Sequence, residues 1–421
     1  MSAGASAGVT RHPEPGTPAM AVRVVDYIGN EGGGVRFSVE LLRALAARSD
    51  VSLEFVSHGP ALDAYRALVG GSAGRIAFRD LPPGAADGWR FDVPAAALDD
   101  CAVVWLPWVH RHRLPDADVA HVVGSFHDAI MLAEPTVRAI FARHLPDEME
   151  TTRRWVDSAA RVVVSSRATV GAMRRLFDAP AERYDVVPVS GAHAGPAADA
   201  LPAAWAWADE PFIVCPANTS PHKNHDVLLA GVGRWGGADR HPLVLTGSGA
   251  DLALSPNPVK AALRPWLETA GLLRRIRATD LRRAARRAGL RRGRSLVPVG
   301  YVSDARYYAL LARAWALVMP TLAEGGGSFP VEEALWAGVP VVCSDIPVLR
   351  EHVERLGASV LWFDPRRPDD LAARLAELEA GYADHKARAV SQRALLRRRT
   401  WADVADEYWS IFTAAAPAAR R

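Results

Sequence analysis

The side chains best suited to chemistry lie in one stretch, residues 321–345, which reads TLAEGGGSFPVEEALWAGVPVVCSD. Glu324 comes first, and two adjacent acids, Glu332 and Glu333, follow a few residues later. The residues directly after Glu324 are Gly325, Gly326, Gly327, Ser328 and Phe329. A carboxylate beside glycines can accept hydrogen bonds from hydroxyl groups of a ligand, while the glycine backbone approaches that ligand closely.

The elements around these residues decide how the acids are placed. The apolar run 316–320 predicts a strand, and PVEEALWAG at 330–338 predicts a helix, because Pro330 suits the first turn and Gly338 suits the position after the last one. The glycines then occupy a strand-to-helix loop, where backbone N–H groups can hold an anion. Acids in a first helical turn also stabilise the helix through its dipole. The two later glutamates therefore have a purely structural interpretation that Glu324 does not share.

Two more polar side chains follow predicted strands. Lys223 lies in the loop PANTSPHKNHD at 216–226, where it can neutralise a phosphate as a point charge; a solvated loop lysine is the alternative. His127, in GSFHDAI at 124–130, can contact a ligand hydroxyl or carbonyl, or it can be structural.

Three other glycine-rich loops are weaker signals. GNEGGG at 29–34 lies between a predicted strand and a helix, but it lacks the G-x-G-x-x-G spacing of the dinucleotide-binding fingerprint, and a plain tight turn is the alternative. TGSGAD at 246–251 is a second strand end rich in glycine. VGYVSD at 299–304 can offer backbone N–H and C=O groups to a base.

Strand-like and helix-like segments alternate along the chain in two series. The strand-like runs are 22–27, 51–57, 101–108, 120–126, 161–166 and 184–190, and then 211–217, 242–249, 295–302, 316–322, 339–345 and 358–364. Repeated βα units predict mostly parallel, doubly wound sheets, whose ligands bind at the carboxyl ends of the strands. The Ala/Pro-rich residues 192–209 are a candidate linker. With two halves, the natural ligand site is the cleft between them.

Composition excludes several classes of protein. The chain has 421 residues, 49% hydrophobic and 23% charged, which is typical of a globular protein with two or three domains. The net charge of +3 is too small to indicate nucleic acid. The three cysteines, Cys101, Cys215 and Cys343, have no metal-ligand spacing. We expect them to be buried in the folded protein, and their small, odd number favours a protein of a reducing compartment. Residues 1–19 lack the apolar core of a signal peptide, so we expect a disordered tail and a cytoplasmic protein.

The order of these motifs resembles that of the retaining GT-B glycosyltransferases, in particular glycosyltransferase family 4 (glycosyl transferases group 1). Over 211–366 the resemblance is carried by EGGGSFPVEEALWAGVPVVCSDIPVLRE, SPHKNHDVLL, VLTGSG, VGYVSD and WFDPRRPDDLA. Nearer the N-terminus it is carried more loosely by EGGGVRFSVELLRALA, SFHDAI, ARVVVSSRATV and VVPVSG.

This resemblance implies an α/β fold of two Rossmann-like domains, with parallel sheets facing across an interdomain cleft and a C-terminal helix crossing back to the N-domain. The expected limits are a disordered tail at 1–19, an N-terminal acceptor domain at 20–200 joined by the helix 400–416, and a C-terminal nucleotide-sugar donor domain at 208–398.

The resemblance also implies a role for individual residues. Lys223 is expected to bind the donor diphosphate, Glu324 to contact the transferred sugar, and His127 to lie near the donor sugar and the acceptor. These three are the expected catalytic residues. The expected donor-binding residues are Gly33, Gly34, Asn218, Gly247, Gly300, Tyr301, Val302, Gly325, Gly326, Gly327, Ser328, Phe329, Glu332 and Glu333.

Two departures from the family pattern bear on these roles. Where the family has an arginine before the phosphate-binding lysine, this chain has Asn218, so Lys223 is expected to carry more of the phosphate neutralisation. The family separates its two glutamates by eight residues, as Glu324 and Glu332 are, but the downstream A-x-x-x-G-x-P pattern aligns Glu333 instead. We favour Glu333 as the acceptor of ribose hydrogen bonds, with one residue inserted in the glycine loop.

The implied reaction is retaining transfer of a hexose or deoxyhexose, with a mannose-type donor slightly favoured, to a hydroxyl of a saccharide or a lipid-linked glycan. A nucleotide-diphosphate sugar is the co-substrate, and no metal or other cofactor is expected. The alternatives are another GT-B enzyme, such as a nucleotide-sugar epimerase or a phosphorylase, and a non-catalytic nucleotide-sugar binding protein.

Residues 272–294 carry ten arginines and one acid. A solvated helix face is one interpretation. The other is peripheral contact with an anionic membrane, which suits a lipid-linked acceptor and location at the inner face of the membrane. Nucleic acid is not expected, because aromatic residues are not interleaved with the arginines.

Overall fold

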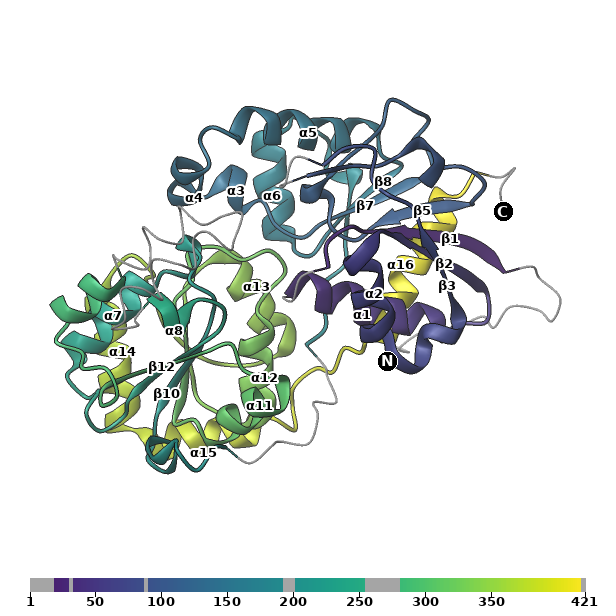
Figure 1. Cartoon of the computed structure of the whole chain (residues 1–421). Coiled ribbons are helices and arrows are strands. Elements are labelled where there is room, and N and C mark those ends of the chain that lie inside the picture. The colour runs from purple at the N-terminus through teal and green to yellow at the C-terminus, as the bar shows by residue number, and fades with distance from the viewer. Residues whose placement is uncertain (1–18, 30–32, 87–89, 192–200, 254–280, 418–421) are drawn as a thin grey trace, which may run out of the picture. The chain divides into compact units, whose positions relative to one another are not determined.

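The computed structural model describes residues 19–29, 33–86, 90–191, 201–253 and 281–417 (Figure 1). Parts of the predicted tail (1–18 of 1–19), of the candidate linker (192–200) and of the arginine-rich segment (272–280) lie outside the described residues. Within them, strands and helices alternate as the sequence predicts.

The first sheet has seven strands in the order β3-β2-β1-β5-β7-β8-β9. Their bounds are Ile76–Asp80, Val51–Ser57, Met20–Val25, Val103–Leu106, Val122–Phe126, Arg161–Val164 and Tyr184–Val186. The pairings of β1 with β2 and with β5 are parallel, as are those of β2 with β3, β5 with β7 and β8 with β9. A small parallel pair joins β4 (Phe91–Asp92) to β6 (His112–Arg113).

The second sheet has six parallel strands in the order β12-β11-β10-β13-β14-β15. Their bounds are Leu296–Gly300, Leu243–Thr246, Ile213–Pro216, Ala316–Met319, Val341–Ser344 and Leu361–Phe363. The α/β architecture with parallel sheets, expected from the βα repeats, is confirmed.

The helices are α1 Gly33–Ala46, α2 Gly59–Val69, α3 Ile130–Ala133, α4 Pro135–Ile140, α5 Leu145–Ser158, α6 Arg167–Leu176, α7 His225–Trp235, α8 Ala250–Ala253, α11 Asp304–Arg313, α12 Phe329–Ala337, α13 Pro347–Leu356, α14 Pro368–Ala380, α15 Tyr382–Gln392 and α16 Trp401–Ala415. Short 3-10 helices are η1 Gly70–Arg75, η2 Ala95–Ala97, η3 Val109–Arg111, η4 Ala181–Arg183, η5 Ala206–Asp209 and η6 Pro221–Lys223.

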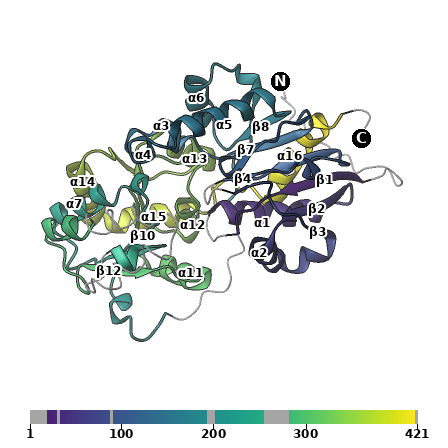
Figure 2. The same cartoon turned by 45° about the horizontal axis from the view of Figure 1, so that its top comes forward.

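The second sheet has a hydrophobic core on each face, because successive residues of a strand point to opposite sides. In β10, Ile213 and Cys215 join one buried cluster and Val214 joins the other. Helices α7 and α14 lie side by side over the first cluster, as Figures 1 and 2 both show. All three cysteines are free and buried, as predicted.

The chain divides into two compact units, Met1–Gly124 with Ala405–Arg421, and Ser125–Val404. The domain limits drawn from the sequence, at 20–200 with 400–416 and at 208–398, stay a prediction.

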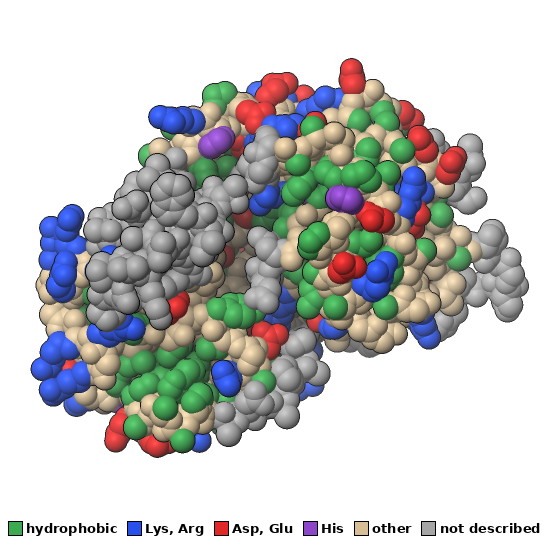
Figure 3. All heavy atoms as spheres, in the orientation of Figure 1, with side chains coloured by type: hydrophobic (Ala, Val, Ile, Leu, Met, Phe, Trp, Pro, Cys, Tyr) green, Lys and Arg blue, Asp and Glu red, His purple; other side chains and the backbone are tan. Residues whose placement is uncertain are grey.

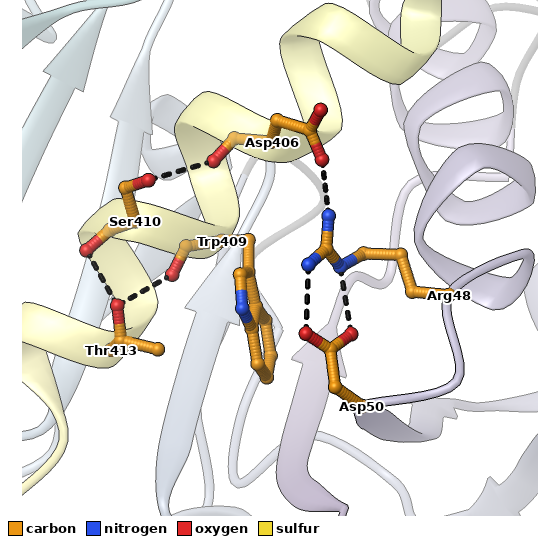
Figure 4. Close-up of polar contacts among 6 residues, drawn as sticks. All are labelled: Arg48, Asp50, Asp406, Trp409, Ser410 and Thr413. Atoms are coloured by element: carbon orange, nitrogen blue, oxygen red, sulfur yellow. Dashed lines mark hydrogen bonds and ion pairs between the residues drawn. The ribbon is translucent and has the colours of Figure 1, made fainter. Parts of the chain in front are cut away.

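The end of the C-terminal helix belongs to the first unit. In α16, Tyr408 and Phe412 pack on Trp105 of β5, with ring centroids 5.4 and 5.9 Å away. Figure 4 shows Arg48 forming ion pairs with Asp50 and with Asp406 of α16. The Arg48 guanidinium also lies 5.0 Å from the centre of the Trp409 ring. The expectation that the C-terminal helix returns to the N-terminal part of the chain is confirmed.

Candidate active site

Helix α12, which follows the glycine loop, begins and ends at capping residues. Ser328 is the N-cap of α12, and its hydroxyl accepts a hydrogen bond from Val331 N at 3.4 Å. Pro330 lies in the first turn, where no intrahelical N–H donor is needed. Gly338 ends the helix with a φ of 67°, a conformation that glycine adopts without strain. The loop of three glycines therefore joins β13 to the N-terminus of a capped helix.

Lys223 and Glu324 meet at the ends of two neighbouring strands. Lys223 Nζ lies 2.5 Å from Glu324 Oε1, and both side chains are largely buried. The loops that carry them are joined by backbone contacts, since the carbonyl of His222 accepts hydrogen bonds from Leu322 N (2.7 Å) and Thr321 Oγ1 (3.0 Å). Two of the three expected catalytic side chains are thus brought into direct contact, 101 residues apart in the sequence.

His222 is a neighbour of this pair that was not predicted from the sequence. Burial lowers the pKa of the His222 imidazole to about 4, and the adjacent charge of Lys223 is the second cause in size. His222 is therefore neutral near pH 7, and Lys223 supplies the positive charge of this loop. The neighbouring Asn224 holds the turn in a left-handed conformation (φ 55°) by donating to the carbonyls of Pro320 and Pro365.

Asn218 stands where the family pattern has an arginine. Its side-chain oxygen accepts a hydrogen bond from Ser220 N at 3.0 Å, which makes a turn within its own loop. An amide brings no charge, and the expectation that Lys223 carries the greater part of an anion's neutralisation stays a prediction.

The three glycines are required by neighbouring protein atoms. A Cβ on Gly325 would lie 1.9 Å from the carbonyl oxygen of His127, and one on Gly326 would lie 2.3 Å from Ser165 Cβ. Gly327 has a φ of 122°, and its Cβ would lie 2.3 Å from His352 Nδ1. From the sequence, the glycines were expected to bring the backbone close to a ligand. The structure adds that each of them also lets the backbone pass against another part of the protein.

His127, the third expected catalytic residue, follows β7 and is buried. Its Nδ1 lies 3.1 Å from Ser165 Oγ, and its carbonyl faces Gly325. The structure thus places His127 beside the glycine loop that follows Glu324.

Glu332 and Glu333 differ in surroundings. Glu332 is completely buried, and its Oε2 lies 3.7 Å from the equally buried His352 Nε2. Burial raises the pKa of Glu332 and lowers that of His352 to about 3, and Arg355 lies 2.9 Å from the other ring nitrogen of the histidine. Glu333 is also buried, with 5% exposure, and it accepts a hydrogen bond from Tyr308 OH at 2.9 Å.

The other expected donor-binding loops also meet at strand ends. Gly300 O accepts hydrogen bonds from Gly247 N (2.8 Å) and Thr246 Oγ1 (2.9 Å), which joins the ends of β11 and β12. Tyr301 is 58% exposed, whereas Val302 packs against the core. Gly247, with a φ of 124°, lets its loop pass against the backbone of Ala217, because a Cβ there would lie 2.6 Å from it.

Gly33 and Gly34 belong to the first unit, where they begin α1. A Cβ on Gly34 would lie 2.9 Å from the ring of Trp108, so the close packing of Trp108 in the same unit explains why a glycine is present there. Among the described residues, no group of three or more His, Cys, Asp or Glu side chains is arranged to hold a metal ion. No helix in this part of the chain is long and apolar enough to cross a membrane.

Residues 284–395, which include the glycine loop and both acids of α12, match the sequence model of the family Glycosyl transferases group 1. The chain is a glycosyltransferase with a group 1 domain. It is also similar to the O-antigen chain mannosyltransferase B of Escherichia coli, with 26% identity over 375 residues, covering 81% of this glycosyltransferase and 85% of the relative.

Solved structures share the fold of this glycosyltransferase over nearly its whole length. HepE of Anabaena, crystallised with UDP and glucose, aligns with a TM-score of 0.64 at 14% identity, covering 94% of this chain and 99% of HepE. Sucrose-phosphate synthase of Thermosynechococcus elongatus gives 0.62 at 15% identity, covering 94% and 98%. WaaG, a glycosyltransferase of lipopolysaccharide biosynthesis, gives 0.57 at 12% identity, covering 93% and 99%. The fold, α/β with parallel sheets in two domains, is that of the GT-B glycosyltransferases, as predicted.

Proposed function

We propose that this enzyme is a retaining glycosyltransferase of family 4. It moves a hexose or deoxyhexose, with a mannose-type donor favoured, from a nucleotide-diphosphate sugar to a hydroxyl of a saccharide or lipid-linked glycan. The observation that carries the proposal is the contact between Lys223 and Glu324 at adjacent strand ends of one sheet. It puts a cation suited to a diphosphate beside a carboxylate suited to sugar hydroxyls.

The ion pair leaves both groups with capacity for a ligand. A lysine ammonium has three donors and a carboxylate has about four acceptor positions, so the single contact of 2.5 Å uses a fraction of each. A donor diphosphate can take the remaining donors of Lys223, while the free lone pairs of Glu324 accept from sugar hydroxyls. The glycine-loop N–H groups at the N-terminus of α12 add positive potential.

In the proposed reaction, the bond between the anomeric carbon and the phosphate oxygen breaks, and its electron pair stays on the nucleoside diphosphate. The acceptor hydroxyl attacks from the same face and gives its proton to the departing phosphate oxygen. The configuration at the anomeric carbon is therefore retained. Lys223 and the loop N–H groups stabilise the charge that develops on the diphosphate, which is electrostatic catalysis.

For the ribose of the donor we propose Glu333. Glu332 is fully buried beside His352, and its carboxyl carbon would lie 2.7 Å from a Cβ on Gly191, so the interior of the protein already surrounds it. Glu333 is the acid that the A-x-x-x-G-x-P pattern aligns with the family, and a hydrogen bond from Tyr308 OH holds its carboxylate in place. The nucleobase is then expected against the backbone of Tyr301 and Val302.

Two comparisons support a nucleotide-sugar donor and a mannose-type sugar. HepE was crystallised with UDP and glucose, and the curated relative is named a mannosyltransferase.

The test is a panel of UDP-, GDP-, ADP- and dTDP-sugars, scored for transfer and for slow donor hydrolysis, with the product anomer read by NMR. Lys223→Ala is expected to lower kcat about 100- to 1,000-fold, the usual cost of removing one preorganised charge-stabilising group. Lys386→Ala is the matched control, because that lysine donates to Gly338 O at the far end of α12. Near-normal transfer by Lys223→Ala would contradict the assignment of phosphate stabilisation to this residue.

The same panel distinguishes the alternative functions. Donor conversion without an acceptor would indicate an epimerase, and a requirement for orthophosphate would indicate a phosphorylase. Binding without turnover would indicate a non-catalytic protein.

We propose in addition that no metal is required, and activity that survives EDTA unchanged is the expected result. Loss of transfer with EDTA and its return with Mg²⁺ or Mn²⁺ would contradict this.

Peripheral contact with an anionic membrane through residues 272–294 is the proposed route to a lipid-linked acceptor. In its described part, Arg291 and Arg294 pair with Asp239 at 2.6 and 3.4 Å, while Arg283 and Arg287 are exposed. On the face shown in Figure 3, Lys and Arg side chains form several separate groups. Sedimentation with anionic vesicles should show binding that weakens with salt. Equal binding to neutral vesicles, or none, would argue against it.

A further inference from the structure

The carbonyl of Gly325 lies against the first turn of α6. It accepts a hydrogen bond from Ser166 Oγ at 2.6 Å, and Thr169 Oγ1 lies 3.0 Å from the same oxygen. Ser166 is also the N-cap of α6, since its hydroxyl oxygen accepts from Thr169 N at 3.1 Å. A serine hydroxyl has one proton and two acceptor positions, so Ser166 can cap the helix and hold the glycine loop at the same time.

A carboxylate from α13 completes this first turn. Glu351 Oε1 accepts from Arg167 N at 2.9 Å, and its Oε2 accepts from Ala168 N at 3.0 Å. These N–H groups have no partner inside a helix, and a negative charge at this end is favoured by the helix dipole. Glu351 therefore fastens α13 to the same turn that holds Gly325.

The consequence reaches Glu324, because Gly325 is the next residue in the chain. Fixing the carbonyl of Gly325 fixes the peptide after it, and the contacts of His222 O with Thr321 and Leu322 fix the chain before Glu324. With the backbone held on both sides, the carboxylate is left with few positions, and in the one observed it meets Lys223.

We propose that Ser166, Thr169 and Glu351 are positioning residues, here called the α6 seat, which set the glycine loop and through it the carboxylate of Glu324. The inference rests on the proposed function, and it assigns these three residues a part in the transfer reaction without contact with the donor.

The principal test is the double variant Ser166→Ala/Thr169→Val, which removes both hydroxyls from Gly325. We expect kcat for donor turnover to fall about 10- to 100-fold, because small displacements of a catalytic group cost that much. The donor KM should stay within about threefold, since the ammonium of Lys223 is untouched. Thr169→Ser keeps the hydroxyl and is expected to keep kcat. The control for loss of a cap is Thr400→Ala, because Thr400 Oγ1 accepts from Asp403 N at the start of α16.

For the carboxylate arm of the seat, Glu351→Gln replaces one acceptor oxygen with an NH₂ group and should lower kcat by a smaller factor. The exposed Glu354 on the same helix provides the control Glu354→Gln, which is expected to keep wild-type kcat.

Amide hydrogen exchange of the peptide 321–331 separates this proposal from the assignment of the enzyme's reaction. The double variant should exchange faster in that peptide than either the wild type or Thr400→Ala. If the exchange rate and kcat of the double variant both equal those of Thr400→Ala, the proposal that the α6 seat positions the glycine loop is wrong. If the wild type turns over no nucleotide sugar, the proposed function fails, while the exchange comparison still decides whether the α6 seat holds the loop.

Discussion

Asp26 is a buried carboxyl group whose charge state depends on the fold. It follows β1 and is 1% exposed, and its two oxygens accept from Tyr65 OH (2.6 Å) and Ile28 N (2.9 Å). His112 Nε2, 3.6 Å away, accepts from Tyr27 N, so the imidazole carries its proton on Nδ1 and is neutral. Burial raises the pKa of Asp26 to about 7, against the two hydrogen bonds and the charge of Arg111, which lower it.

The direction of the resulting pH dependence follows from linkage. Between pH 4 and 7 the folded protein holds a proton on Asp26 that the unfolded chain releases, so this group stabilises the fold fully below pH 4. That contribution is lost as the pH rises to 7, by an amount on the order of 4 kcal/mol. We predict that the difference in unfolding free energy between wild type and Asp26→Asn falls from pH 4 to 7 and is flat above pH 8. The opposing titration of His112 is common to both proteins and largely cancels.

Urea unfolding at several pH values measures this difference. Asp403→Asn is the control of opposite sign, because hydrogen bonds from Thr400 N and Oγ1 lower the pKa of Asp403. The contribution of Asp403 is present above the carboxylate's ordinary pKa and is lost as the pH falls through its lowered value. A difference for Asp26→Asn that does not change with pH would refute the assigned charge state.

Individual site residues could be predicted from the sequence where both the residue type and a position after a predicted strand indicated a ligand contact. Lys223 and Glu324 each follow a predicted strand, and adjacent parallel strands bring their carboxyl ends together, so their contact could be expected. Asp26, Ser166 and His352 gave no such signal. Tyr65 is 39 residues from Asp26 in the sequence and Gly325 is 159 residues from Ser166, and only packing shows those contacts.

The packing of α16 on β5 leads to a prediction about stability. Tyr408 is 1% exposed and packs against Trp105 and Phe412. Tyr408→Ala leaves a cavity between α16 and β5, and we expect it to destabilise the protein by about 3–5 kcal/mol. Asp406→Ala breaks an ion pair in which Asp406 is 54% exposed, and it should cost less than about 1 kcal/mol. Urea unfolding of both variants tests this, and equal losses would contradict the packing account.

The elements were predictable where both faces of a strand are buried. The predicted runs at 51–57 and 211–217, which are alternating or continuously apolar, contain β2 (Val51–Ser57) and β10 (Ile213–Pro216). Strand β3, IAFRD, was missed, because it lies at the edge of its sheet and carries two charges among five residues. The helix after the glycine loop was predicted from Pro330 and Gly338, and its start differs by one residue because Ser328 is the cap.

For the whole molecule, the division into two compact units predicts how the protein melts. Two compact units are expected to give two calorimetric transitions, since large proteins commonly depart from two-state unfolding. The candidate donor residues Lys223, Glu324 and Glu333 all belong to the unit Ser125–Val404. A nucleoside diphosphate should therefore stabilise that unit first.

At a concentration of 100 Kd, a bound diphosphate adds about 2.7 kcal/mol, which corresponds to an upward shift of about 5 °C in the transition of a unit of this size. Scanning calorimetry with GDP and UDP measures the shift, and Lys223→Ala should abolish it while Lys386→Ala retains it. Because the ligand acts on the folded unit that binds it, a single transition that shifts as a whole would mean that the two units unfold together. A shift confined to the transition of the first unit would place the diphosphate away from Lys223 and contradict the proposed donor site.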